Sequence, residues 1–147
     1  MPVNVDDLAD RLLAFVRGFG LHRGETTPCG MPISVSEAHA LMELAAGSLG
    51  QTELGHRLGL TKSTVSRLVT LLDERGWVRR SADANDGRAA QLVLTGEGRR
   101  AAAQLATARR QRLGALLEAI EPSQRPAVLQ ALATLTAAAQ STDPRHA

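Results

Sequence analysis

Short hydroxyl and cationic side chains gather between residues 61 and 70, and side chains of these types can hydrogen-bond to nucleic-acid bases and phosphates. The members of this polar face are Thr61, Lys62, Ser63, Ser66, Arg67 and Thr70. Arg67 is the best candidate for a bidentate contact to guanine, a pairing worth about 1–3 kcal/mol of base discrimination. The alternative is a solvated helix face with no partner.

The residues between these positions predict the helix that would present them. Apolar residues recur at i, i+3, i+4 and i+7 and form a stripe for burial on the other side. This stripe consists of Val65, Leu68, Val69 and Leu72. Thr61 can cap the helix by accepting a hydrogen bond from a free backbone N–H of the first turn. A polar face opposite a buried stripe is what a major-groove helix requires.

A shorter helix and a tight turn precede this one. Leu54, Leu58 and Leu60 give them an apolar side, and Gly59 supplies the positive φ that ends the first helix. The segment is therefore predicted to be a helix-turn-helix.

After Gly76 the period changes from 3.6 to 2, which predicts strands over 77–80 and 89–94. The polar segment 81–88 between them contains Asn-Asp-Gly and suits a hairpin tip. A helix-turn-helix followed by a β-hairpin is a winged helix.

Three arginines of this hairpin are candidate contacts to DNA. Arg88 at the tip is placed to enter an adjacent minor groove, and Asp86 could hold its guanidinium in a fixed direction. Arg79 and Arg80 point to opposite faces of a strand, so at most one is expected to meet a phosphate. Arg75 is interpreted as structural, paired with an acid such as Asp73 or Asp86.

The run LGHRLGLTKSTVSRLVTLLDERGWVRR, followed by DGRAAQLVLT, resembles the DNA-binding core of the MarR family of bacterial regulators. The resemblance extends from about Val5 to about Ala139. It implies that the helix over Thr61–Arg75 is the recognition helix and that Asp86–Ala89 form the wing tip. Gly50 stands at a cap position where the family usually has Ser or Thr, a departure that costs at most a few tenths of a kcal/mol.

The implied fold class is mainly α with a small β-hairpin wing. A winged helix-turn-helix DNA-binding lobe is expected at about 34–98, and an α-helical dimerisation region at about 4–20 and 99–140, within a single domain 1–147. The 147-residue length suits one domain, and the 2% aromatic content predicts a core of Leu, Val and Ala.

Capping signals define the helices outside the winged-helix core. Asn4 with Asp7 predicts a helix that ends near Gly18–Gly20, and a loop follows over 20–33. Ser34-Val35-Ser36-Glu37 is a capping box for a helix that ends near Ala46.

The chain after the wing is predicted to be two further helices and a tail. Thr95 caps a long helix to about Ile120, roughly 38 Å at 1.5 Å per residue. Ser123 is expected to cap the final helix with Pro126 in its first turn, and the tail 141–147 is expected to be disordered.

The apolar residues of the terminal helices exceed what so small a domain can cover, which predicts a homodimer. As in the MarR family, the first helix and the two C-terminal helices of each subunit would intertwine. A two-fold dimer presents two recognition helices about one turn apart, so the operator should be a pseudo-palindrome. The alternative is a monomer whose long helix folds back.

Charge agrees with DNA as the partner. Residues 51–100 hold nine Lys and Arg against six Asp and Glu, whereas the remainder holds eight against nine. The positive excess therefore lies in the winged-helix segment, although an excess of this size is within ordinary scatter. One cysteine excludes an internal disulfide, and neither a signal peptide nor an 18-residue apolar run occurs. A cytoplasmic protein without a membrane partner is expected.

The family resemblance also implies a small-molecule effector that releases the DNA. Its pocket is expected between the dimer helices and the winged-helix lobe, near the 20–33 loop. The candidate ligand-binding residues are Phe15, Cys29, His39 and Met42.

Cys29 leaves a second regulatory hypothesis open, a thiol-based redox sensor. A reactive thiol needs a cationic neighbour, and Arg23 is close in sequence; the alternative is an incidental loop cysteine. No metal or cofactor is expected: His22, Cys29 and His39 are only loosely grouped, and the long helix has no His where zinc-sensing relatives place theirs.

No nucleophile elbow, Walker loop, dinucleotide fingerprint or paired catalytic His and acid occurs, so the chain is predicted not to be an enzyme. The prediction is a sequence-specific transcriptional regulator, a repressor because repression is the family's common mode. The remaining alternative is a winged helix that binds protein without DNA. The polar face speaks against that alternative, because a protein interface would show Leu, Met or aromatic residues there.

Overall fold

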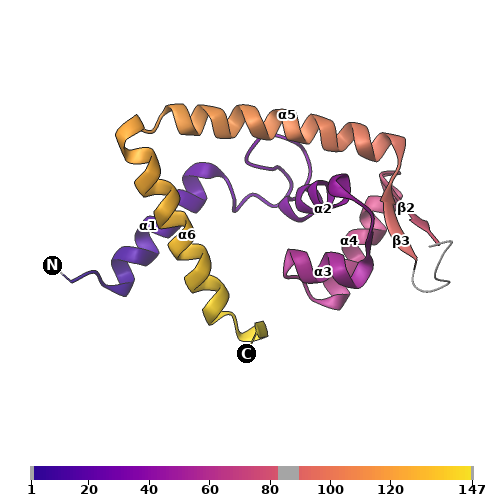
Figure 1. The fold of residues 1–147 in the computed structure, drawn as a ribbon, viewed down its shortest axis with the longest axis horizontal. Helices are drawn as coiled ribbons and strands as arrows, with labels where there is room; N and C mark the ends of the chain where they lie inside the picture. The colour runs from indigo at the N-terminus through magenta and orange to yellow at the C-terminus, as the bar shows by residue number, and fades with distance from the viewer. Residues whose placement is uncertain (1, 83–89, 147) are drawn as a thin grey trace. The chain divides into compact units, whose positions relative to one another are not determined.

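The computed structural model describes residues 2–82 and 90–146, as six α-helices, two short 3-10 helices and a three-stranded sheet (Figure 1). In chain order the elements are α1 (Val5–Phe19), α2 (Val35–Ala46), β1 (Leu49–Gly50), α3 (Gln51–Leu58), α4 (Lys62–Glu74), β2 (Val78–Ser81), β3 (Gln91–Leu94), α5 (Gly96–Glu118), η1 (Pro122–Gln124), α6 (Arg125–Thr142) and η2 (Pro144–His146). The prediction of a mainly helical chain with a small β wing is confirmed. The chain divides into two compact units, Met1–Arg109 and Arg110–Ala147.

The predicted caps of the first helices are confirmed. Asn4 accepts a hydrogen bond from the Asp7 N–H at 2.9 Å, and Thr61 accepts one from the Thr64 N–H at 3.3 Å. Ser34 and Glu37 form the complete capping box at the start of α2. Gly50 precedes α3 without a side-chain cap, as its lack of a side chain requires.

The sheet has one more strand than the sequence predicts. Its order is β1-β3-β2, antiparallel throughout, with Leu49 opposite Leu92 and Val78 opposite Leu94. β1 is only two residues long, too short to show a period of 2 in the sequence. The two predicted wing strands are confirmed within one or two residues of their expected ends; Ala89 lies outside the described residues.

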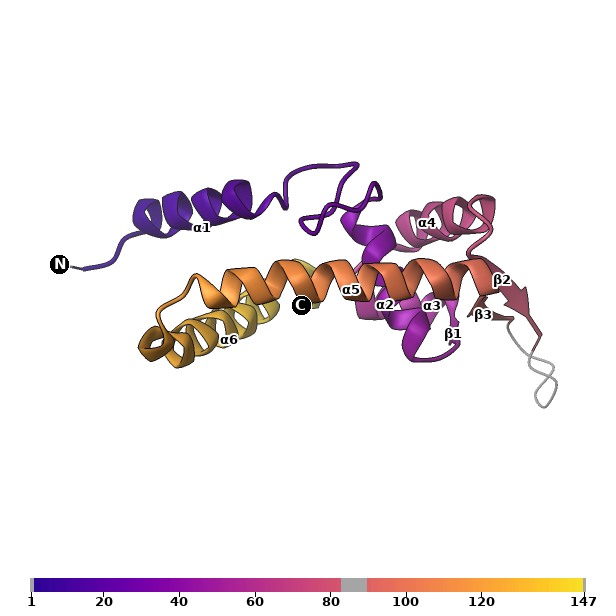
Figure 2. The same cartoon turned by 90° about the horizontal axis from the view of Figure 1, so that it is seen from above.

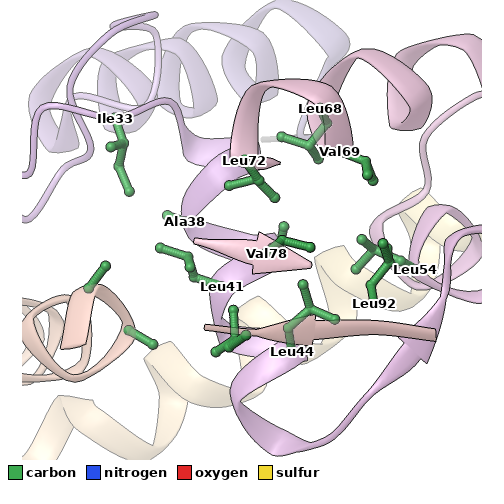
Figure 3. Close-up of a cluster of buried hydrophobic side chains, with 14 of the residues drawn as sticks. Ile33, Ala38, Leu41, Leu44, Leu54, Leu68, Val69, Leu72, Val78 and Leu92 are labelled. Carbon is green, nitrogen blue, oxygen red and sulfur yellow. The ribbon is translucent and has the colours of Figure 1, made fainter. Parts of the chain in front are cut away.

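The core of the first unit is built between α2, α4 and the sheet. Figure 3 shows Leu68, Val69 and Leu72 pointing from α4 towards Val78 of β2 and Leu41 of α2. The largest fully buried side chains are all leucines, Leu41, Leu54, Leu72, Leu92 and Leu105. The predicted stripe on α4 is thus buried, and its opposite side faces solvent.

α5 begins close to the end of α4, at a junction that we call the wing corner (Gly76, Trp77, Thr95 and Gly98). The Thr95 hydroxyl donates to the Gly76 carbonyl at 2.5 Å, and the Thr95 N–H donates to the Trp77 carbonyl at 2.9 Å. Thr95 also caps α5 as predicted, because its Oγ1 accepts from the Gly98 N–H at 3.0 Å. A Cβ at Gly98 would lie 2.0 Å from the Trp77 carbonyl oxygen. Only glycine therefore permits this approach. From the corner α5 runs to Glu118 as one continuous helix (Figure 2).

Two predictions for the C-terminal helix are wrong. Gln124, not Ser123, is the N-cap of α6, because η1 occupies Pro122–Gln124 and no side chain caps the helix. The end of the chain is more regular than expected, since α6 continues to Thr142 and η2 follows it. The alanines 137–139 favour continued helix, and the Thr142 hydroxyl donates back to the Ala138 carbonyl at 3.0 Å.

The helices outside the winged-helix core expose their apolar residues. Neither α1 nor α6 contains a buried residue. The exposed large apolar side chains of α1, α5 and α6 are Val5, Leu8, Leu12, Leu13, Phe15, Leu113, Leu117, Leu129, Leu132 and Leu135. Within the described ranges, no helix combines the length and the apolar character needed to cross a bilayer.

Candidate nucleic-acid interface

The six residues of the predicted polar face lie together on α4 and at its N-cap. Thr61, Lys62, Ser63, Ser66, Arg67 and Thr70 are all exposed. The buried residues of the same helix are Val65, Leu68, Val69 and Leu72. The geometry therefore presents hydroxyl and cationic groups on one side of a helix whose other side is fixed in the core.

Hydrogen bonds within the helix separate these six residues into two groups. Thr61 is engaged as the cap and contacts the Ser63 hydroxyl at 3.3 Å, and the Thr70 hydroxyl donates to the Ser66 carbonyl at 3.0 Å. The side chains of Lys62, Ser66 and Arg67 have no hydrogen-bond or ionic partner in the described part of the chain. Their donors and acceptors are therefore the most available for an external partner.

The two arginines of β2 also differ in whether their side chains are hydrogen-bonded to described residues. Arg80 donates through Nη2 to the Gln51 Oε1 at 2.9 Å, which ties β2 to the first residue of α3. Arg79 is exposed and makes no such bond to a described residue. Of the two, Arg79 has the guanidinium that is available to a phosphate. Asp86 and Arg88, the predicted wing-tip residues, lie outside the described residues.

A surface cavity of about 520 Å³ lies where the first turns of α3 and α4 meet. It is lined by Gln51, Thr52, Gly55, His56, Leu60, Lys62 and Val65. Gly55 permits the close approach of the two helices, since a Cβ there would lie 2.7 Å from Val65 Cγ2. Helix N-termini with a nearby lysine favour anionic groups, so this cavity adds to the cationic character of the face.

The structural interpretation of Arg75 is correct, but the acid that pairs with it among the described residues is Glu37 and not Asp73. Asp86, the other acid proposed, lies outside the described residues. Arg75 Nε donates to Glu37 Oε1 at 2.6 Å, and the guanidinium carbon lies 5.0 Å from the centroid of the Trp77 ring. The capping-box spacing identified Glu37 as a cap residue. No local pattern assigns its second oxygen to a residue 38 positions later. We refer to this arrangement as the Glu37–Arg75–Trp77 link.

The four candidate ligand-binding residues are not joined in the described structure. Phe15 stacks on Phe19 within α1, with 5.6 Å between ring centroids. Met42 packs against the core from α2, and His39 is exposed on the same helix. No hydrogen bond, ion pair or ring contact connects any two of Phe15, Cys29, His39 and Met42, all of which are described.

His39 has a perturbed titration although it is exposed. The protein around its ring lowers its pKa below the usual 6.5 by desolvation, and the positive charge of Arg109 adds to this effect. Glu43 acts in the opposite direction but is the smallest of the three causes. The charged form of His39 is therefore less favoured than that of a free histidine.

Cys29 lies partly buried in the loop before α2. Its Sγ is 3.0 Å from the Thr27 hydroxyl, and Arg23 lies instead against Gly20, with its Cδ 3.8 Å from the position that a Cβ would take there. The geometry thus gives Cys29 a neutral neighbour rather than the cation that thiol activation requires. In the part of the chain that is described, no group of three His, Cys, Asp or Glu side chains could hold a metal ion.

Comparisons with known proteins agree with this geometry. The model of the MarR family matches residues 30–89. A probable transcriptional regulator from Pseudomonas aeruginosa is 26% identical over 90% of this chain and 99% of its own, with a TM-score of 0.71. The PcaV transcriptional regulator from Streptomyces coelicolor is 24% identical over 95% and 99%, with a TM-score of 0.71. ZitR from Lactococcus lactis, solved in complex with DNA, is 19% identical over 92% and 97%, with a TM-score of 0.68. No curated protein sequence matches the chain.

The matched segment contains α2, α3, α4 and β2, which are the elements that carry the polar face and its support. The likeness in fold extends over nine-tenths or more of the chain in these three structures. MarR-family transcriptional regulators are DNA-binding proteins and not enzymes. The chain is thus similar to the MarR family of regulators over residues 30–89, and it shares the winged-helix fold of the solved regulators over nine-tenths or more of its length.

Proposed function

We propose that this protein is a sequence-specific transcriptional regulator that binds a pseudo-palindromic operator as a homodimer and acts as a repressor. One observation carries the proposal. α4 buries its apolar stripe completely and leaves Lys62, Ser66 and Arg67 exposed, with no partner among the described residues. A rigidly held helix with free cations and hydroxyls is suited to a major groove, where such groups read base edges and phosphates.

Each candidate contact receives a specific role. Arg67 reads guanine, Lys62 binds phosphate near the first turn of α4, and Ser66 hydrogen-bonds to a base edge or phosphate. Thr61, Ser63 and Thr70 line the same face, with hydroxyls already engaged within the helix. Arg79 contacts phosphate from the wing.

The wing tip completes the interface. Arg88 enters the neighbouring minor groove, directed by Asp86. Arg88→Ala is expected to weaken operator binding at least tenfold in a gel-shift titration, and unchanged affinity would remove the wing from the proposal.

The homodimer is supported by the unpaired apolar side chains of the terminal helices. Leu129, Leu132 and Leu135 of α6 are 63%, 48% and 42% exposed. Such a row on one helix is a surface for a protein partner. We assign residues of about 4–20 and 99–140 to dimerisation and about 34–98 to DNA binding. Sedimentation equilibrium should give twice the chain mass, and Leu132→Glu should shift the protein towards monomer.

Release by a small molecule is the proposed mode of regulation. The PcaV regulator has been solved with its natural ligand, which supports an effector site in proteins of this fold. The candidate contacts are Phe15, Cys29, His39 and Met42. A ligand that prefers the DNA-incompetent arrangement of the dimer would shift the population away from binding.

The decisive experiment selects bound sequences from a random DNA pool and measures affinity for the consensus by fluorescence anisotropy. Arg67→Ala should weaken binding about 5- to 150-fold and relax specificity at one base pair, because a bidentate contact carries about 1–3 kcal/mol. Lys62→Ala should weaken binding to all sequences and reduce the salt slope by about 1. Arg57→Gln is the control, because Arg57 on α3 is paired with Glu53 and Glu43.

Absence of binding to duplex DNA at low ionic strength would overturn the proposal. Affinity that does not fall between about 50 and 200 mM salt would also contradict it, since phosphate contacts release counterions.

A further inference from the structure

We propose that Arg75 is a positioning residue for DNA binding: it fixes the end of the recognition helix and the start of the wing to α2 without touching DNA. The inference rests on the proposed function, because it concerns the same helix and wing. Its basis is the Glu37–Arg75–Trp77 link.

The first half of the link joins α4 to α2. Arg75 is the C-cap residue of α4, and its N–H donates to the Leu71 carbonyl at 3.1 Å. Its side chain reaches Glu37, whose side chain is only 3% exposed. Both carboxylate oxygens of Glu37 are used, since Oε2 accepts from the Ser34 N–H at 2.7 Å and Oε1 accepts from Arg75 at 2.6 Å. Removing the cation from a buried carboxylate strongly destabilises a protein, and this cost favours the Glu37–Arg75 contact in the folded state.

The second half of the link joins the same guanidinium to the wing. Arg75 lies over the Trp77 ring, an arrangement attractive to a cation. The backbone of Trp77 is fixed on both sides: its N–H donates to the Leu72 carbonyl at 3.0 Å, and its carbonyl accepts from the Thr95 N–H at 2.9 Å. Trp77 belongs to the wing corner, where β2 and α5 begin. One residue therefore joins three elements: its side chain contacts Glu37 of α2 and Trp77 before β2, and its backbone N–H caps the end of α4.

A direct phosphate contact is the competing role for an arginine on this helix, and the geometry disfavours it. One edge of the Arg75 guanidinium is bonded to Glu37 and one face covers Trp77. Arg75 also lies at the opposite end of α4 from Lys62, about 20 Å away along a 13-residue helix. Its side chain is 35% exposed, less than the 46% of the surface-paired Arg57.

The positioning role and a purely electrostatic role of Arg75 predict opposite effects of replacing Glu37 on the affinity for DNA. Removing a carboxylate from a protein that binds DNA strengthens the electrostatic attraction, so Glu37→Gln would raise affinity if charge alone mattered. If Glu37 positions the helix through Arg75, Glu37→Gln instead lowers affinity. We expect Glu37→Gln and Arg75→Gln each to reduce affinity for the selected operator about tenfold. The double variant should be no weaker than the weaker single one, because both changes break one link.

The salt slope provides an independent readout. A phosphate contact contributes about 1 to the slope, so an unchanged slope for Arg75→Gln supports positioning and a slope reduced by about 1 overturns it. The matched control is Arg57→Gln, which breaks exposed pairs with Glu43 at 3.3 Å and Glu53 at 3.0 Å. Exposed pairs of this kind contribute little, so its affinity should stay within twofold of the wild type.

Folding is monitored by circular dichroism, and affinity is compared at a temperature where every variant is fully folded. If either glutamine variant does not fold, the affinity of Arg75→Lys distinguishes a phosphate contact from a positioning role. It keeps the charge, and a phosphate contact would tolerate it. A positioning role requires the planar group that bonds Glu37 and stacks on Trp77, and predicts at least a threefold loss. If Arg75→Lys or Glu37→Gln binds the operator with wild-type affinity, the inference about Arg75 is wrong and the proposed function still stands. If the wild-type protein does not bind DNA, the proposed function itself is wrong.

Discussion

Replacing Gly98 by alanine adds one methyl group at the most crowded point of the wing corner. The new Cβ would lie 2.0 Å from the Trp77 carbonyl oxygen, where ordinary contacts begin at 3.4 Å. The first turn of α5 must therefore move by about 1.4 Å, the difference between these two distances. The obstacle is a backbone atom, and it cannot rotate away as the end of a side chain could.

The cost follows from what that movement breaks. Overpacking in a filled site destabilises by about 1–3 kcal/mol. The shift also lengthens the two bonds from Thr95 to Gly76 and Trp77, each worth about 0.5–1.5 kcal/mol. Allowing for overlap between these effects, we expect Gly98→Ala to lower the free energy of unfolding by about 2–4 kcal/mol.

Urea denaturation followed by circular dichroism measures this loss. All variants are compared at one protein concentration, because the proposed dimerisation would make apparent stability concentration-dependent. Gly96→Ala, two residues earlier, is the matched control. Its Cβ would lie 3.8 Å from Arg100 Nη1, an ordinary contact with a flexible side chain. It should change stability by less than about 0.5 kcal/mol. Equal stability of the two variants would refute the close approach of α5 to Trp77.

Two further predictions follow from the caps and the titrating groups. Ser34→Ala removes the side-chain half of the capping box and should cost about 1 kcal/mol in urea denaturation, whereas Ser34→Gly should cost only a few tenths; equal losses would contradict the cap. An NMR titration should place the pKa of His39 below 6.5, and Arg109→Gln should raise it without reaching 6.5, because desolvation is the larger cause. Since the unfolded chain then binds more protons than the folded one, stability should fall as the pH decreases from 6.5 through the folded pKa. His39→Gln should flatten that fall, and an unchanged pH profile would contradict the linkage.

Local signals in the sequence were sufficient for most elements of the fold. The stripe from Val65 to Leu72 predicted both the helix and its buried side, because a 3.6-residue period is a direct record of which face is covered. The caps at Asn4, Ser34 and Thr61 were equally local, since each bond spans three residues.

What the sequence could not predict depended on long-range partners. β1 is two residues long and exists only because Leu49 and Gly50 pair with β3. The partner of Arg75 was assigned to an acid nearby in sequence, whereas Glu37 reaches it through the tertiary fold. The Ser123 cap was wrong because Pro122 starts a 3-10 turn that carries the chain past Ser123 before α6 begins.

The polar face of α4 and its N-cap was predicted to the level of residue types and exposure. The exposure of its six residues followed from the helical period, but the sequence did not predict which of them hydrogen-bond to other described residues. Thr70 lies on the predicted face, yet its hydroxyl donates to the Ser66 carbonyl, a choice that depends on its rotamer. Similarly, Arg80 and not Arg79 donates a hydrogen bond to Gln51, and no pattern in the sequence links Gln51 to Arg80.

The wing corner fixes the N-terminal end of the long helix α5. Thr95, which caps its first turn, is bonded to the backbone of Gly76 and Trp77 just after α4, and α5 is 23 residues long, about 34 Å. A tilt of only about 5° over that length displaces one end by roughly 3 Å, close to the 3.4 Å rise of a base pair. In the proposed DNA complex, a tilt of α5 by a few degrees would therefore be large enough to move α4 out of step with the groove.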